Sequence, residues 1–160
     1  MLDEKRMNRV LEKLDTDQML ITDPCAIFYL TGRWIFAGER FLGLLIKKGQ
    51  KPILYLNELF RFDEELGVTK KMITDTDSVA ELLKCDVDPN KALGVDKTLA
   101  ARFLLPMIDG AIASKFINGS LAVDHTRAIK DEEEIALLRE SSRINDLAMT
   151  EFKKLPKTGM

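Results

Sequence analysis

Short apolar runs alternate with helical patterns along the first 117 residues, and this alternation is the strongest constraint on the fold. Two of the runs, 41–46 and 52–56, flank the polar stretch Lys47-Lys48-Gly49-Gln50 and predict a β-hairpin with a turn of about four residues. Strands that alternate with helices are typical of an α/β domain. Because the hairpin makes one strand pair antiparallel, we expect a mixed sheet.

The other elements follow from apolar periodicity and from turn residues. Ser78 and Glu81 form a capping box that starts a helix. Gly67 closes a helical pattern, and Pro106 is expected to disturb another. These two helical patterns cover 58–66 and 99–105, and one more helix is predicted over 3–14. Strands are predicted over 19–22, 72–74, 92–96 and 113–117. The run 26–30 fits a helical turn or a strand, and Asp23-Pro24 precedes it.

A long helix is predicted from Asp131 onward. Asp131 is the expected N-cap, Glu134 stands at the third position, and four carboxylates lie at the positive end of the helix dipole. The polar stretch 124–127 before it is interpreted as a connector to another domain, and the ending after the breaker residues 155–159 indicates a cut. One face of the helix carries Leu137, Ile144, Ala148 and Phe152.

Composition excludes several classes of protein. The chain has 24 Lys and Arg against 26 Asp and Glu, almost evenly spread over both halves, so no basic face for nucleic acid is expected. No apolar stretch approaches the ~20 residues that span a bilayer, and no signal peptide follows Met1. We therefore expect a cytoplasmic protein with no membrane partner, in which Cys25 and Cys85 are free thiols.

Motifs for complete active sites are missing. The sequence contains no phosphate-binding glycine loop, no His-Glu-x-x-His, no Cys-x-x-Cys and no Gly-x-Ser-x-Gly. The single imidazole, His125, fits a solvated position better than a functional one, and the acidic run 131–134 is explained by helix capping rather than by metal binding. We expect no catalytic, cofactor-binding or metal-ligating residue in these 160 positions.

The segment 33–40 is the most informative for function. It contains the only Trp, Trp34, the aromatic residue Phe36 and the arginines Arg33 and Arg40, and glycines stand at positions 32 and 38. Trp and Arg are enriched at interface hot spots, which favours a loop that closes over a ligand or a partner subunit. The alternative, left open, is that Trp34 and Phe36 cap the hydrophobic core.

Several blocks together resemble the N-terminal domain of the creatinase/prolidase family, which includes Xaa-Pro dipeptidases and Xaa-Pro aminopeptidases. The resemblance spans nearly the whole chain and rests on these blocks: Leu20-Ile21-Thr22-Asp23-Pro24, Tyr29-Leu30-Thr31-Gly32, Gly38-Glu39-Arg40, Leu93-Gly94-Val95-Asp96 and Arg127-Ala128-Ile129-Lys130-Asp131-Glu132-Glu133-Glu134-Ile135.

The resemblance implies a three-layer, ribonuclease H-like α/β domain over 1–123, in which helices flank a mixed sheet. A linker and a long helix over 124–160 would lead to a separate catalytic domain. That domain would hold two divalent metal ions, with manganese expected, which activate water for attack on the bond before proline. The implied partners are a second subunit and proline-containing peptides. By the same resemblance, segment 33–40 is a wall that limits substrate length, with Arg33, Trp34, Phe36 and Arg40 as the candidate substrate-lining residues.

Two other functions stay open within the same resemblance. One is a protein-binding module from a family member without metal ligands, as in some histone-chaperone subunits. The other is a creatinase-like amidinohydrolase. The blocks at 29–32 and 38–40 look most similar to the prolidase branch.

Overall fold

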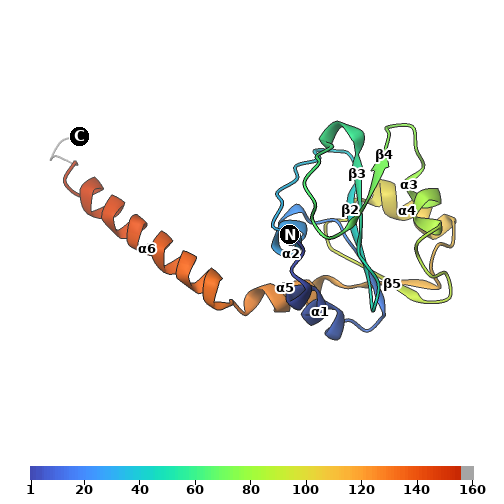
Figure 1. The fold of residues 1–160 in the computed structure, drawn as a ribbon, viewed down its shortest axis with the longest axis horizontal. Helices are drawn as coiled ribbons and strands as arrows, with labels where there is room; N and C mark the ends of the chain where they lie inside the picture. Colours follow the sequence, from blue (N-terminus) through green and yellow to red (C-terminus); the bar gives the residue numbers. More distant parts are fainter. Residues whose placement is uncertain (156–160) are drawn as a thin grey trace. The chain divides into compact units, whose positions relative to one another are not determined.

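Within residues 1–155, which the computed structural model describes, six strands form one mixed sheet (Figure 1). The strand order is β4-β3-β2-β1-β5-β6. The bounds are β1 Gln18–Ile21, β2 Leu42–Lys47, β3 Ile53–Asn57, β4 Thr69–Ile73, β5 Ala92–Val95 and β6 Lys115–Asn118. The helices are α1 Glu4–Glu12, α2 Pro24–Thr31, α3 Val79–Lys84, α4 Ala101–Asp109, α5 Ser120–Ala128 and α6 Glu132–Phe152, with a 3-10 turn η1 at Glu58–Phe60.

The pairing of the strands confirms the predicted hairpin and the mixed sheet. Strand β2 is antiparallel to both β1 and β3, with Ile21 opposite Leu44 and Leu44 opposite Leu54. The pairs β3–β4, β1–β5 and β5–β6 are parallel. Because β2 alone runs against the others, the carboxyl ends of five strands and the start of β2 meet at one edge of the sheet.

Two hydrophobic clusters lie on opposite faces of the sheet, which gives the expected three layers. Met19 and Ile21 join a cluster with α1, α2 and the start of α5, whereas Leu20 between them joins a cluster with α3 and α4 (Figure 1). The central strands are buried on both faces and therefore read as continuous apolar runs. The largest fully buried side chains are Tyr55, Met19, Leu20, Ile21, Ile27, Leu30, Leu44, Leu45, Ile46, Leu54, Leu56 and Leu66.

The ambiguous run 26–30 is helical. Asp23 caps α2 by accepting a hydrogen bond from the backbone N–H of Cys25 at 3.0 Å, and Pro24 occupies the first turn, where its missing N–H costs little. Gly32 ends the helix with φ +70°, a conformation that suits glycine. The pair Asp23-Pro24 thus ends one strand and starts the next helix.

The predicted helix over 58–66 is wrong. Only η1 forms there, because the Asn57 side chain caps it and Arg61 returns to an extended conformation. Phe60 and Phe62 then pack on the core two residues apart, with the period of an extended chain. Carbonyl groups that a helix would use internally are bound elsewhere: Lys70 donates to those of Phe62 and Glu64, and Leu2 donates to that of Leu66.

The polar stretch 124–127 lies inside α5. The Thr126 side chain is buried, and its hydroxyl donates to the Ala122 carbonyl at 2.7 Å. Lys13, the C-cap residue of α1, donates to the same hydroxyl at 3.2 Å. His125 is exposed, as its solvated interpretation predicts.

Two other helices differ in detail from their patterns. Helix α4 continues through Pro106 to Asp109, and it begins at Ala101 rather than at Leu99. In α3 the Ser78 hydroxyl accepts from the Glu81 backbone at 3.4 Å, whereas the Glu81 carboxylate accepts from Lys84 at 2.6 Å.

The chain divides into two compact units, Met1–Thr126 and a second unit that begins at Arg127. In the second unit Asp131 and Glu134 form a full capping box, with hydrogen bonds of 2.9 and 3.1 Å, as predicted. No residue of α6 is buried. The breaker residues 156–159 lie outside the described residues. Along residues 1–155 no helix is both long and apolar enough to cross a membrane.

Candidate functional site

The segment 33–40 joins α2 to β2 and alternates buried and exposed side chains. Ile35 and Ala37 are about 5% exposed and belong to the core, whereas Trp34 is 53% and Phe36 72% exposed. Gly38 turns the chain at φ +58°. The side chains that close the core are therefore Ile35 and Ala37, and the two aromatic rings of the segment remain on the surface.

The first half of the segment packs on the loop between η1 and β4 and on α2. The Arg33 guanidinium donates to the Glu64 carboxylate at 2.8 Å and lies 4.7 Å from the centre of the Phe62 ring. The Trp34 ring meets Phe28 of α2 edge to face, with 6.0 Å between the ring centres. Arg33 and Trp34 thus have partners within the domain but keep much of their surface exposed.

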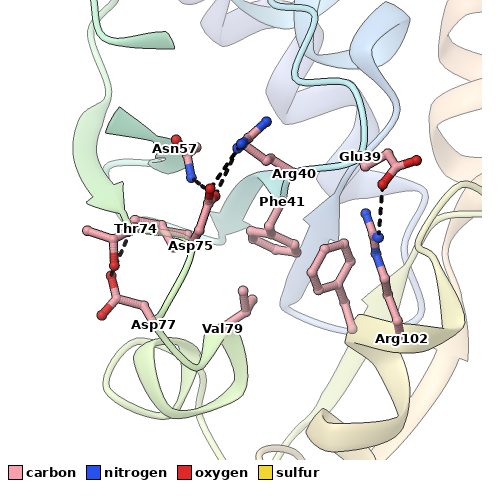
Figure 2. Close-up of a pocket in the computed structure, with 11 residues that line it drawn as sticks. Glu39, Arg40, Phe41, Asn57, Thr74, Asp75, Asp77, Val79 and Arg102 are labelled. Atoms are coloured by element: carbon pink, nitrogen blue, oxygen red, sulfur yellow. Dashed lines mark hydrogen bonds and ion pairs between the residues drawn. The ribbon is translucent and has the colours of Figure 1, made fainter. Parts of the chain in front are cut away.

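The second half of the segment borders an open cavity of about 370 Å³ at the carboxyl edge of the sheet (Figure 2). Strand ends and helix starts supply its walls, as the strand directions require. Its floor is apolar and its rim carries charges of both signs. The lining residues are Glu39, Arg40, Phe41, Asn57, Ile73, Thr74, Asp75, Asp77, Val79, Arg102 and Phe103.

Arg40 is bound to Asp75 by two parallel hydrogen bonds. Its Nε donates to Asp75 Oδ1 at 2.8 Å, and its Nη2 donates to Asp75 Oδ2 at 2.9 Å. The hydrogen bond from Arg40 holds the pKa of the Asp75 carboxyl below its ordinary value, and Asp75 in turn raises the pKa of the guanidinium. Both groups are therefore charged near neutral pH.

A smaller cavity of about 190 Å³ adjoins the first and shares Glu39, Arg40, Arg102 and Phe103 with it. Phe36, Gly38, Thr22, Pro24 and Thr98 belong to its lining. Above the shared boundary, an Arg102 nitrogen lies 3.9 Å from a Glu39 carboxylate oxygen (Figure 2). Because the Glu39 side chain is 94% exposed, this pair is loose and can yield to a bound group.

Asp96 joins the ends of β1 and β5 beside these cavities. Its carboxylate accepts hydrogen bonds from the backbone N–H groups of Thr22 and Asp23 at 2.6 and 2.8 Å, and from both hydroxyls of Thr22 and Thr98. Asp96 is 8% exposed. With its oxygens used in this way, it holds the edge of the sheet together and does not face a ligand.

The four sequence-predicted residues do not form a single cluster. Phe36 and Arg40 line the smaller cavity together, whereas Arg33 and Trp34 pack against Glu64, Phe62 and Phe28. Sequence reasoning missed Asp75 and Arg102, which complete the charged rim, and the buried amide of Asn57 beside Asp75. The motif Thr74-Asp75-Thr76-Asp77, at the end of a predicted strand, was the only available signal.

The lining of these cavities supplies groups that can contact a ligand. The rim offers guanidinium groups, carboxylates and an exposed aromatic ring around an apolar floor. Such a surface can make both charged and apolar contacts. Among the described residues no three His, Cys, Asp or Glu side chains lie close enough together to hold a metal ion.

Residues 5–129 match the family model described as the creatinase/prolidase N-terminal domain. The chain belongs to this family. The matched range contains all six strands of the described sheet and the segment 33–40. Membership confirms the resemblance drawn from the sequence blocks.

Curated relatives are peptidases of greater length. A peptidase of Staphylococcus aureus, described as uncharacterised, is 25% identical over 147 residues, which cover 88% of this chain and 41% of that protein. A similar peptidase of Staphylococcus epidermidis is 24% identical over 98% of this chain and 45% of its own length. The chain thus spans less than half the length of the curated relatives it matches.

Solved structures share the fold. A dipeptidase of Pyrococcus horikoshii superposes with a TM-score of 0.78 at 23% identity, over 98% of this chain and 45% of that one. The Xaa-Pro dipeptidase of Bacillus anthracis gives 0.77 at 20% identity, over 98% and 44%. The N-terminal domain of an X-Pro dipeptidase from Streptococcus pyogenes gives 0.57 at 20% identity and covers 72% of this chain and 92% of that domain.

Proposed function

We propose that this chain is the N-terminal, non-catalytic part of a proline-specific metallopeptidase, an Xaa-Pro dipeptidase or aminopeptidase. The observation that carries the proposal is the match of residues 5–129 to the creatinase/prolidase N-terminal domain, together with the superposition of 98% of the chain on less than half of a dipeptidase and of an Xaa-Pro dipeptidase. In this proposal the remainder of the parent protein holds two divalent metal ions, with manganese expected. The parent is a cytoplasmic homodimer.

The role proposed for the segment 33–40 is to line the substrate path and to limit substrate length. Trp34 and Phe36 support it, because they stay exposed while their neighbours Ile35 and Ala37 fill the core. An exposed aromatic ring leaves apolar surface in contact with water, which is unfavourable. Such rings are typical of surfaces that contact another molecule. The rings therefore provide the wall for a peptide chain.

The two arginines of the segment differ in their readiness to meet a substrate carboxylate. The guanidinium of Arg40 is held by Asp75 through two parallel hydrogen bonds. Arg33 has one ion pair with Glu64, whose side chain is 52% exposed, so this pair exchanges with solvent or ligand at little cost. Arg33 is therefore the better candidate for a charged contact, and Arg40 for holding the segment in place.

The experiment is an assay of the complete enzyme on Xaa-Pro dipeptides and on tripeptides, with and without manganese. If the segment limits substrate length, Trp34→Ala and Arg33→Ala should change the ratio of kcat/KM between the two peptide classes by about tenfold, which is about 1.4 kcal/mol of transition-state binding. Leu121→Ala is the matched control, since Leu121 is an exposed apolar residue on α5.

Two results would contradict the proposal. An unchanged ratio in both variants argues against the wall. If the remainder of the parent protein lacks carboxylate and histidine side chains that can hold the two metal ions, this argues against the peptidase and instead favours a protein-binding module.

A further inference from the structure

The segment 33–40 is held by side chains more than by its backbone. Among the hydrogen bonds of the described residues, no backbone N–H of residues 34–39 donates to another group. The segment is fixed by Ile35 and Ala37 in the core and by one ion pair at each end, Arg33 to Glu64 and Arg40 to Asp75. Its position therefore depends on a few side-chain contacts.

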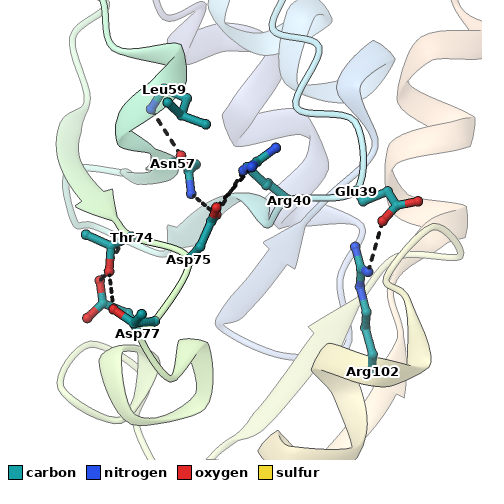
Figure 3. Close-up of polar contacts among 9 residues, drawn as sticks. Glu39, Arg40, Asn57, Leu59, Thr74, Asp75, Asp77 and Arg102 are labelled. Atoms are coloured by element: carbon teal, nitrogen blue, oxygen red, sulfur yellow. Dashed lines mark hydrogen bonds and ion pairs between the residues drawn. The ribbon is translucent and has the colours of Figure 1, made fainter.

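The ion pair at the Arg40 end is part of a longer chain of hydrogen bonds (Figure 3). Asn57, which is buried at the end of β3, donates from Nδ2 to Asp75 Oδ1 at 2.7 Å. Its Oδ1 accepts from the backbone N–H of Leu59 at 3.0 Å, which fixes the direction of the amide. Asn57 at the end of β3 thus orients the Asp75 carboxylate, which also accepts from Arg40.

The loop that carries Asp75 is fixed as well. The Asp77 carboxylate accepts from the Thr74 backbone N–H at 2.7 Å and from the Thr74 hydroxyl at 2.8 Å, so the turn after β4 is closed on itself (Figure 3). Asp75 stands between these two residues. The Asp75 carboxylate therefore faces Arg40 from a loop that is stabilised by its own hydrogen bonds.

We propose that Asp75 is a positioning residue, which holds the Arg40 end of the segment so that Phe36 and Glu39 stay at the rim of the two cavities. The inference rests on the proposed function, in which this segment lines the substrate path. Asp75 acts through Arg40 and does not itself need to touch a substrate.

Exposure and geometry support positioning rather than stabilisation of the fold. The side chains of Arg40 and Asp75 are 40% and 58% exposed, and ion pairs this exposed contribute little to folding. Two parallel hydrogen bonds nevertheless fix the orientation of the Arg40 guanidinium. A Lys side chain in its place would form a single hydrogen bond and would not be oriented in this way. Loss of Asp75 should therefore release the segment and leave the core intact.

A single indole can report on this release, because the chain contains one Trp. We would place the reporter at position 36 by combining Trp34→Phe with Phe36→Trp, which an exposed site accommodates. In this background Asp75→Asn should roughly double the amplitude of nanosecond depolarisation measured by time-resolved anisotropy, because loop motions occur on that timescale. Arg40→Gln should have the same effect, and the double variant should add nothing.

The ion pair at the other end supplies a matched control. Glu64→Gln removes the partner of Arg33, so it should mobilise the native indole of Trp34 more than the reporter at position 36. Asp17→Asn removes a similarly exposed pair, with Lys91, and should affect neither reporter. Circular dichroism should be unchanged in all variants, and Asp75→Glu should recover part of the rigidity.

The outcomes separate this inference from the function on which it rests. Unchanged anisotropy at position 36 in Asp75→Asn overturns the positioning role, whatever the activity of the complete enzyme. If anisotropy rises, the complete enzyme should show a severalfold higher KM for dipeptides with kcat nearly unchanged, because binding geometry alone is lost. A rise in anisotropy with both constants unchanged supports positioning and contradicts the proposed substrate wall.

Discussion

Strand β1 is buried along its whole length, whereas the segment 33–40 alternates buried and exposed side chains. The backbone of β1 pairs with β2 on one side and β5 on the other. The segment depends instead on two buried side chains and two exposed ion pairs. Substitutions in β1 should therefore destabilise the fold, whereas substitutions in the segment should change the surface that the fold presents.

The largest effect is expected in β1. Leu20 is completely buried between α3, α4 and the sheet, so Leu20→Ala should lower the free energy of unfolding by about 2–5 kcal/mol, through lost burial and a residual cavity. Urea unfolding followed by circular dichroism measures this. Leu121→Ala, at an exposed position, should stay within about 0.5 kcal/mol of the parent. Equal losses in the two variants would contradict the comparison.

A smaller effect is expected at Gly38, inside the segment. Its φ of +58° disfavours a Cβ, but nothing lies within 4 Å of where one would stand, so Gly38→Ala should cost about 1 kcal/mol from backbone strain alone. Gly49→Ala in the hairpin turn is a matched control, because Gly49 has φ +72° and equally open surroundings. Both should lose similar stability in urea, but only Gly38→Ala should change the fluorescence of Trp34. A change of Trp34 fluorescence in both variants would show that the segment 33–40 is not structurally independent of the hairpin turn.

The same contrast explains what could be predicted from the sequence. The hairpin was predictable because apolar runs and a turn are local signals, and the capping box at Asp131 is local too. The region 58–66 was not, because Leu2, distant in the sequence, and Lys70 of β4 bind carbonyl groups that a helix would have used. Local patterns thus fail where the backbone finds partners outside its own segment.

The candidate site, too, could be predicted only where the signal is local in the sequence. The segment 33–40 could be singled out by its composition, since it combines the only Trp with a second aromatic residue, two arginines and a glycine. Asp75 could not, because its relation to Arg40 exists only after β2, β3 and β4 pair and bring together residues 35 positions apart. The alternation of Ile35 and Ala37 with the exposed rings likewise became visible only in three dimensions.

The Arg40–Asp75 ion pair of the segment should contribute to stability in a pH-dependent way. Arg40 lowers the pKa of Asp75 below the ordinary 3.8, so the pair contributes to stability above that value and loses its contribution as pH falls through the lowered pKa. The stability difference between the parent and Asp75→Asn should be small but measurable at pH 7 and should vanish toward pH 2. Urea midpoints measured across this range test it. A difference independent of pH would show that the ion pair does not contribute.

The smallest effect on stability is expected at Trp34, where the consequences for function should be largest. The ring is half exposed and meets only the edge of Phe28 among aromatic partners in the described chain, so Trp34→Phe should change the free energy of unfolding by less than about 0.5 kcal/mol. In the complete enzyme the same substitution shrinks the proposed wall and should shift the preference between dipeptides and tripeptides. Unfolding midpoints and kcat/KM ratios, measured on the same variants, therefore test whether the two properties separate. A large loss of stability at Trp34 would place the ring in the core and remove the distinction between β1 and the segment.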